Sequence, residues 1–146
     1  MQLAVLHGPN LNRLGERNPA KYGQATLDDI TRDVDATAQR IDVTVRHFQS
    51  NYEGAITDWV HEHHHLLHGY VINPAGLASY GYALLDAVRD TDRPFAIVHI
   101  SQWYARDGKD RTDIFAGPAT VYLTGAGWRG YSLALEALVQ HIRDRQ

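Results

Sequence analysis

The stretch TLDDITRDVDATAQRIDVTVRHF, residues 26–48, contains a helical pattern followed directly by a strand pattern. Residues 42–48 alternate between apolar and polar side chains, which is typical of a half-buried strand. Thr26 is a good N-cap for the preceding helix, and two acidic residues follow in its first turn. Within residues 26–40 the apolar side chains recur on one helix face, at Leu27, Ile30 and Val34.

The same alternation of strand and helix extends over the whole chain. We expect the other strands at 3–7, 70–73, 95–101 and 119–125, and the other helices at 53–68, 79–90 and 130–144. Five strand-helix repeats predict an α/β fold, with an open five-stranded parallel sheet and helices on both faces. No repeat or linker divides the 146 residues, so we expect a single domain over 1–146.

The composition is that of an ordinary globular protein, with 44% hydrophobic and 21% charged residues. A formal net charge of -3 gives no electrostatic reason to expect nucleic acid or an anionic membrane as a partner. The chain has no cysteine, which excludes disulfides and thiolate metal sites. It shows no signal-peptide pattern or long apolar stretch. We therefore expect a cytoplasmic protein whose partner is a small molecule.

Polar side chains follow the predicted strands where each strand ends. Because ligands of open parallel sheets bind beyond the carboxyl ends of the strands, these side chains should converge on one edge. A single loop asparagine is more often a turn residue than a ligand. A group of asparagines with a histidine at one edge instead favours a binding site, here Asn10, Asn51, Asn73, His99 and Ser101.

The loop after the first strand, HGPNLNRLGERNPAKYG at 7–23, is much longer than most connections in α/β units. Its glycines do not fit a phosphate-binding loop. It carries Arg13, Arg17 and Tyr22. A tyrosine ordinarily titrates near pH 10, so it becomes a base at neutral pH only beside a cation. Without further information, these are surface residues; beside a substrate, they would be a base and its activating charge.

The stretch HEHHH at 61–65 fits the H-E-x-x-H signature of zinc proteases. The predicted helix, however, runs away from the carboxyl edge of the sheet, and no separate third ligand is evident. We therefore interpret these histidines as a solvated helix face and predict no metal site.

Five stretches together resemble the type II 3-dehydroquinate dehydratase family: HGPNLNRLGERNPAKYG, QSNYEGAITDWVH, INP, VHIS and GWRGYSLAL. They occur in order over nearly the whole chain. The resemblance implies a flavodoxin-like fold and an anti elimination of water from 3-dehydroquinate through an enolate. It implies no metal or organic cofactor, and a homo-oligomer built from trimers, a dodecamer in that family.

The resemblance also implies catalytic roles. Tyr22 matches the base that takes the proton next to the ketone, and Arg17 matches the arginine that keeps it ionised. Asn10 matches the asparagine that stabilises the enolate through a water. His99 matches the acid that protonates the departing hydroxyl. Together these residues would supply a base activated by a neighbouring charge, a hydrogen-bond donor near the enolate oxygen, and an acid for the leaving group. These roles are chemically consistent with one another.

The substrate-binding positions match only in part. Asn73 matches the asparagine that orients the substrate and the histidine, and Ile100 with Ser101 matches the backbone pair that receives a carboxylate. In the third-strand loop Ser79 stands in place of a substrate-gripping histidine. Of the two arginines after the fourth strand, Arg106 is kept.

Two further departures concern charge. Asp110 replaces the second of those arginines, although Arg111, one residue along, is a candidate to recover its contact. Ile97 replaces the acidic residue that holds the catalytic histidine in the family, and the sequence offers no obvious substitute. These losses leave three alternatives open: a paralogue that acts on a related hydroxy-ketone, a non-catalytic metabolite-binding member, and a flavin or nucleotide binder that shares only the fold class.

Overall fold

The computed structural model describes all residues, 1–146, and contains one five-stranded sheet in the order β2-β1-β3-β4-β5. Every pair of neighbouring strands is parallel. This is the flavodoxin-like strand order, in which the chain reverses direction across the sheet between β1 and β3. The strands are β1 (Gln2–His7), β2 (Thr44–Gln49), β3 (Tyr70–Asn73), β4 (Phe95–His99) and β5 (Val121–Thr124).

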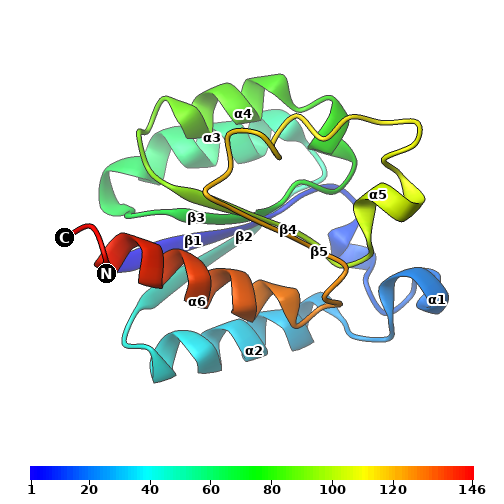
Figure 1. Cartoon of the computed structure of the whole chain (residues 1–146), viewed down its shortest axis with the longest axis horizontal. Helices are drawn as coiled ribbons and strands as arrows, with labels where there is room; N and C mark the ends of the chain where they lie inside the picture. The colour runs from blue at the N-terminus through cyan, green and yellow to red at the C-terminus, as the bar shows by residue number, and fades with distance from the viewer.

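Four longer helices cover the two faces of the sheet (Figure 1). Helices α2 (Leu27–Arg40) and α6 (Gly130–Arg143) lie on one face, and α3 (Glu53–His63) and α4 (Tyr82–Arg89) on the other. Two short helices, α1 (Pro19–Tyr22) and α5 (Trp103–Arg106), lie beyond the carboxyl edge. The predicted fold class is confirmed. No helix is long and apolar enough to cross a membrane.

Helix α2 begins where the sequence predicts, with Thr26 as its N-cap. The Thr26 hydroxyl oxygen accepts the backbone N–H of Asp29 at 3.1 Å, and the Asp29 carboxylate accepts the backbone N–H of Thr26 at 2.9 Å. This reciprocal capping box satisfies two N–H groups that the helix cannot bond itself. It fixes the point at which the long first loop ends and the helix starts.

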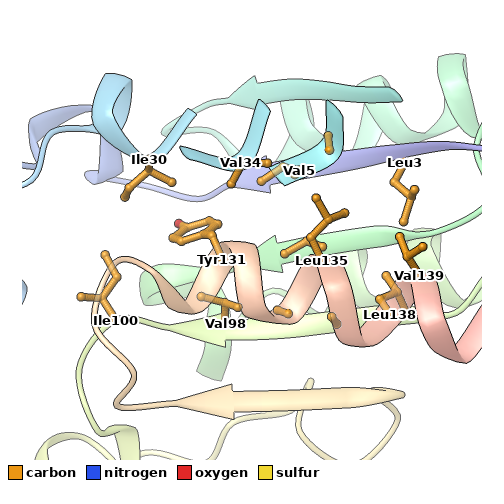
Figure 2. Packing of buried hydrophobic residues seen from close by; sticks show 14 of the residues in the cluster. Leu3, Val5, Ile30, Val34, Val98, Ile100, Tyr131, Leu135, Leu138 and Val139 are labelled. Atoms are coloured by element: carbon orange, nitrogen blue, oxygen red, sulfur yellow. The ribbon is translucent and has the colours of Figure 1, made fainter. Parts of the chain in front are cut away.

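The sheet separates two apolar clusters. Figure 2 shows the cluster under α2 and α6, in which Tyr131 and Leu135 of α6 point toward Val5 of β1 and Val34 of α2. The second cluster lies under α3 and α4 and includes Ile97 of β4 and Phe115. A sheet buried on both faces explains why its central strands read as continuous apolar runs.

Several predicted boundaries are corrected. Strand β2 starts at Thr44 rather than 42, because Asp42 has a left-handed φ of 56° that extended backbone excludes. The predicted helix 53–68 ends as α3 at His63, and a 3₁₀ turn, η2 (His64–Leu66), follows. The predicted helix 79–90 begins only at Tyr82, as α4, and Ser79 instead ends a 3₁₀ helix, η3 (Ala75–Ser79). The first loop contains another 3₁₀ turn, η1 (Leu11–Arg13).

Candidate active site at the carboxyl edge of the sheet

A cavity of about 330 Å³ lies at the carboxyl edge, beyond the ends of β1, β3 and β4. This is the switch point at which ligands bind in open α/β sheets. Its wall brings together residues from the three segments that follow β1, β3 and β4. Among the predicted site residues it contains Asn10, Arg17, Tyr22, Asn73, His99, Ile100, Ser101 and Arg111.

The loop after β1 is held against the loop after β3. Gly8 N–H donates to the backbone oxygen of Asn73 at 2.8 Å. A Cβ on Gly8 would lie 2.4 Å from the carbonyl oxygen of Pro74, so only glycine allows this approach. The turn then places Asn10 in the left-handed region, at φ 69°, and directs the loop along the cavity. The backbone of this loop therefore sets the distance between Asn10 and Asn73.

Asn51 supports this loop from outside the cavity wall. Its side-chain oxygen accepts the backbone N–H of Asn10 at 2.8 Å and the side-chain amide of Gln49 at 3.2 Å. The same Gln49 amide group donates to the carbonyl oxygen of Gly8 at 3.3 Å. The asparagine at the end of β2 thus reaches the predicted edge, but it positions the Asn10 backbone instead of facing the cavity.

Helix α1 forms a lid that carries Tyr22. Asn18 caps the helix by accepting the N–H of Ala20 at 2.9 Å, and Pro19 fits its first turn. Arg17 Nη2 donates to the Tyr22 hydroxyl at 3.1 Å, and the guanidinium carbon lies 4.1 Å from the centre of the Tyr22 ring. The predicted pairing of Arg17 with Tyr22 is therefore present in the geometry, within the cavity wall.

The lid is attached to the segment that follows β4. Lys21 Nζ lies 3.4 Å from the carboxylate of Asp107, and both side chains are about three-quarters buried, with exposures of 24% and 22%. Arg106 donates to the carbonyl oxygen of Ala20 at 3.4 Å. These two contacts hold α1 against the region of α5, so the lid lies over the cavity.

His99, at the end of β4, has an acidic partner that the sequence did not reveal. Its Nε2 lies 2.6 Å from Asp113 Oδ2, and the two side chains are 6% and 0% exposed. The Tyr122 hydroxyl donates to the same carboxylate oxygen at 2.9 Å. No substitute for the acidic residue at Ile97 was evident in the sequence, but Asp113, from the irregular segment before β5, contacts His99.

Trp103 is a cavity-wall residue that the sequence did not place. Its ring stacks on His99 with centroids 4.7 Å apart and an interplanar angle of 28°. It is 4% exposed, and its indole N–H is buried without a hydrogen-bond partner. Because the two rings stack, the indole of Trp103 restricts the orientation of the His99 imidazole.

Two predicted substrate-binding residues lie outside the cavity wall. Ser79 ends η3 with its hydroxyl buried and without a hydrogen-bond partner, and Arg106 is directed at the lid backbone. Arg111 is part of the wall, whereas Asp110 is exposed and is not. Arg111, the cation predicted to recover the substrate contact that Asp110 cannot make, therefore lines the cavity, one residue after Asp110.

The histidine-rich stretch lies at the opposite edge of the sheet, as predicted. Helix α3 starts after the carboxyl end of β2 and runs back, and the backbone N–H of His68 donates to Gln2 at the start of β1, at 2.8 Å. The His63 ring stacks on Trp59 at 4.2 Å, and His61 and His65 are exposed. No three of these side chains gather as metal ligands do.

The chain matches the family described as dehydroquinase class II over residues 1–139. It is 41% identical to the 3-dehydroquinate dehydratase of Halothermothrix orenii over 142 residues, which are 97% of this chain and 96% of that protein. It is 39% identical to the Bacillus subtilis enzyme of that name, over 92% of this chain and 91% of that one. The crystal structure of type II dehydroquinase from Propionibacterium acnes superposes with a TM-score of 0.88 at 34% identity, covering 95% and 96% of the two chains. The chain therefore belongs to the class II dehydroquinase family.

Proposed function

We propose that this protein is a hydro-lyase that converts 3-dehydroquinate to 3-dehydroshikimate by anti elimination of water. The observation that carries the proposal is the presence, in one cavity, of a tyrosine hydroxyl bonded to an arginine and a histidine bonded to a carboxylate. These are a charge-activated base and a supported acid, which a β-elimination next to a ketone requires.

The proton is removed by Tyr22. The guanidinium of Arg17 stabilises the phenolate, since an arginine stays charged and does not compete for the proton. The phenolate oxygen takes a proton from the carbon next to the ketone, and the electron pair of the broken C–H bond moves into an enolate. Asn10, which also lines the cavity, supplies a polar group toward the enolate oxygen, directly or through a water.

The hydroxyl leaves with a proton from His99. As the enolate collapses to the conjugated enone, the C–O bond breaks and the imidazolium gives its proton to the departing oxygen, so water is released. Asn73, at the end of β3, lies in the same wall as His99 and is placed to orient the substrate hydroxyl. The cations Arg111 and Lys21, with the backbone at Ile100 and Ser101, suit an anionic, hydroxylated substrate.

The test is turnover of 3-dehydroquinate by the purified protein, followed by the absorbance of the conjugated enone. We expect steady turnover that Tyr22→Phe reduces by about 10³-fold or more, since general base catalysis contributes roughly 10² to 10⁴. Tyr52→Phe, at a tyrosine 77% exposed, is the matched control and keeps full activity. Folded protein without turnover would refute the proposal and direct the search to related hydroxy-ketones or to metabolite binding.

We also propose a cytoplasmic protein, and a homo-oligomer built from trimers as the family resemblance implies. Tyr80 and Tyr82, beside the start of α4, are 72% and 62% exposed, and such aromatic rings are typical of subunit contacts. Light scattering coupled to size exclusion tests the oligomer. A mass that is a multiple of three chains supports it, and a monomer at micromolar concentration contradicts it.

A further inference from the structure

The Asp113 carboxylate is the centre of a buried hydrogen-bond network beside the active-site cavity. Oδ2 lies 2.6 Å from His99 Nε2 and accepts the Tyr122 hydroxyl at 2.9 Å, while Oδ1 accepts the backbone N–H of Phe115 at 3.0 Å. The side chain is fully buried. A buried carboxylate with three donors around it is held in one orientation.

This network defines which nitrogen of His99 carries a proton. A carboxylate can only accept, so the proton of the short bond belongs to Nε2 of the imidazole. Nδ1 is then the ring nitrogen without a hydrogen bond inside the protein. The Trp103 ring on one side and the edge contact with Tyr122, with centroids 5.9 Å apart, hold the plane of the imidazole.

Tyr122 keeps the carboxylate in its accepting role. Burial and the neighbouring Asp113 carboxylate raise the pKa of Tyr122, so the phenol retains its proton and remains a donor. Because Tyr122 lies on β5 next to β4, its hydroxyl approaches Asp113 from the sheet, whereas Phe115 approaches from the loop. These two hydrogen bonds connect the Asp113 carboxylate to β5 as well as to its own loop.

The position of Ile97 explains why the acid can come from elsewhere. Ile97 precedes His99 by two residues on β4, so the two side chains lie on the same face of the sheet. Ile97 is fully buried in the apolar cluster with Phe115. The segment that carries Phe115 packs on this face of the sheet. It brings the Asp113 carboxylate to His99, while Ile97 stays in the apolar cluster.

We propose that Asp113 is the positioning residue of the His99 acid, with the carboxylate supplied by the loop before β5 instead of by β4. It holds the Nε2–H tautomer, fixes the direction of Nδ1 and balances the charge of the imidazolium before proton transfer. This inference rests on the proposed function for the role of His99. It predicts that dehydration does not require an acid at Ile97.

The kinetic test compares Asp113→Asn with Asp110→Asn in the full-length protein. An amide at 113 places an NH₂ group against at least one of three donors, so it cannot reproduce the network. We expect Asp113→Asn to lower kcat about 10²-fold or more, with KM changed by only a few-fold, because the acid and not the binding is affected. Asp110 is exposed on the same segment, and its variant keeps the parent kcat. Equal kcat for the two variants would overturn the proposal.

Two further measurements extend the test: the first controls for folding, and the second needs no substrate. Tyr122→Phe removes only one donor to the carboxylate. We expect a several-fold loss of kcat at unchanged thermal stability, and an unchanged kcat counts against the network.

The second measurement is NMR of the parent protein labelled with ¹⁵N-histidine, with the His99 signals assigned by comparison with His99→Asn. We expect a protonated Nε2 whose proton is downfield and exchanges slowly. An unprotonated Nε2 would overturn the proposal even if 3-dehydroquinate is turned over. A protonated Nε2 without turnover would instead refute the proposed function alone.

Discussion

Arg17 and Tyr22, five positions apart in the sequence, form a local pair: the guanidinium donates to the phenol oxygen at 3.1 Å, and its carbon lies 4.1 Å from the centre of the ring. The short segment between the two residues therefore sets the distance from the guanidinium to the hydroxyl. Helix α1, capped by Asn18 and started by Pro19, fixes that geometry. The proposed base and its activating charge therefore form one local unit.

Replacing Arg17 tests whether its charge activates Tyr22. At about 4 Å and an effective dielectric constant near 20, a unit charge contributes about 4 kcal/mol to a phenolate. We expect Arg17→Met to lower kcat by about 10²-fold or more, and Arg17→Lys, which keeps the charge without the planar fork, to lose less. Steady-state kinetics with 3-dehydroquinate measure kcat for both variants. Equal kcat for the methionine and lysine variants would show that charge is not what Arg17 contributes.

The contact between Lys21 and Asp107, both in the cavity wall, attaches the lid to the segment after β4. The pair is partly exposed and is worth under about 1 kcal/mol after solvent screening, so its loss should have a modest effect. We expect Asp107→Asn to raise KM by about two- to fivefold and to speed tryptic cleavage after Arg17 and Lys21. Unchanged KM and unchanged cleavage would mean that the lid stays closed without this contact.

Gly8 controls the spacing of the two loops that carry Asn10 and Asn73. Its Cβ would lie 2.4 Å from the oxygen and 2.7 Å from the carbon of the Pro74 carbonyl, so Gly8→Ala must separate the loops. We expect kcat/KM to fall more than about tenfold, since small misplacements of catalytic groups are costly. Gly54→Ala, on α3, meets nothing within 4 Å and is the matched control, with unchanged activity. Full activity of Gly8→Ala would contradict the argument.

The convergence of the site could be predicted from the sequence because it follows from topology. Once the strands are recognised as parallel, the residues after each strand must meet at one edge, and Asn10, Asn73 and His99 do so. The same reasoning placed the histidines of α3 at the other edge. Thr26 was predictable as a cap because the interaction is local.

Asp113 could not be found in this way. It lies in a polar segment without periodicity, and its contact with His99 depends on the path of that segment over the sheet. Trp103 could not be placed either, since stacking on a histidine leaves no sequence pattern. The boundary of α3 failed because residues 61–68 continue an apolar and polar pattern that suits α-helix and 3₁₀ turn alike.

The buried His7 makes the protein sensitive to acid. Burial, and then the neighbouring His47, lower the pKa of His7 from 6.5 to about 3. Between these values the unfolded chain binds a proton that the folded chain does not, so the free energy of unfolding falls as the pH falls through this window. The slope from this group is up to about 1.4 kcal/mol per pH unit.

Urea unfolding between pH 7 and pH 4 measures this slope. We expect His7→Asn to have a shallower dependence than the parent protein, although its stability at pH 7 is lower because the Tyr131 hydroxyl, 3.3 Å from the His7 ring, loses its partner. His61→Asn, at an exposed position, is the control and keeps the parent slope. Identical slopes for His7→Asn and the parent would contradict the assignment.

The central claim is that Tyr22 and His99 act on opposite faces of a bound hydroxy-ketone. The most direct measurement uses 3-dehydroquinate that carries deuterium stereospecifically on the carbon between the ketone and the departing hydroxyl, with the product analysed by mass spectrometry. The account predicts that deuterium anti to the hydroxyl is lost to solvent, whereas deuterium syn to it is retained in 3-dehydroshikimate. Loss of the syn deuterium would contradict it, because base and acid would then act from the same face.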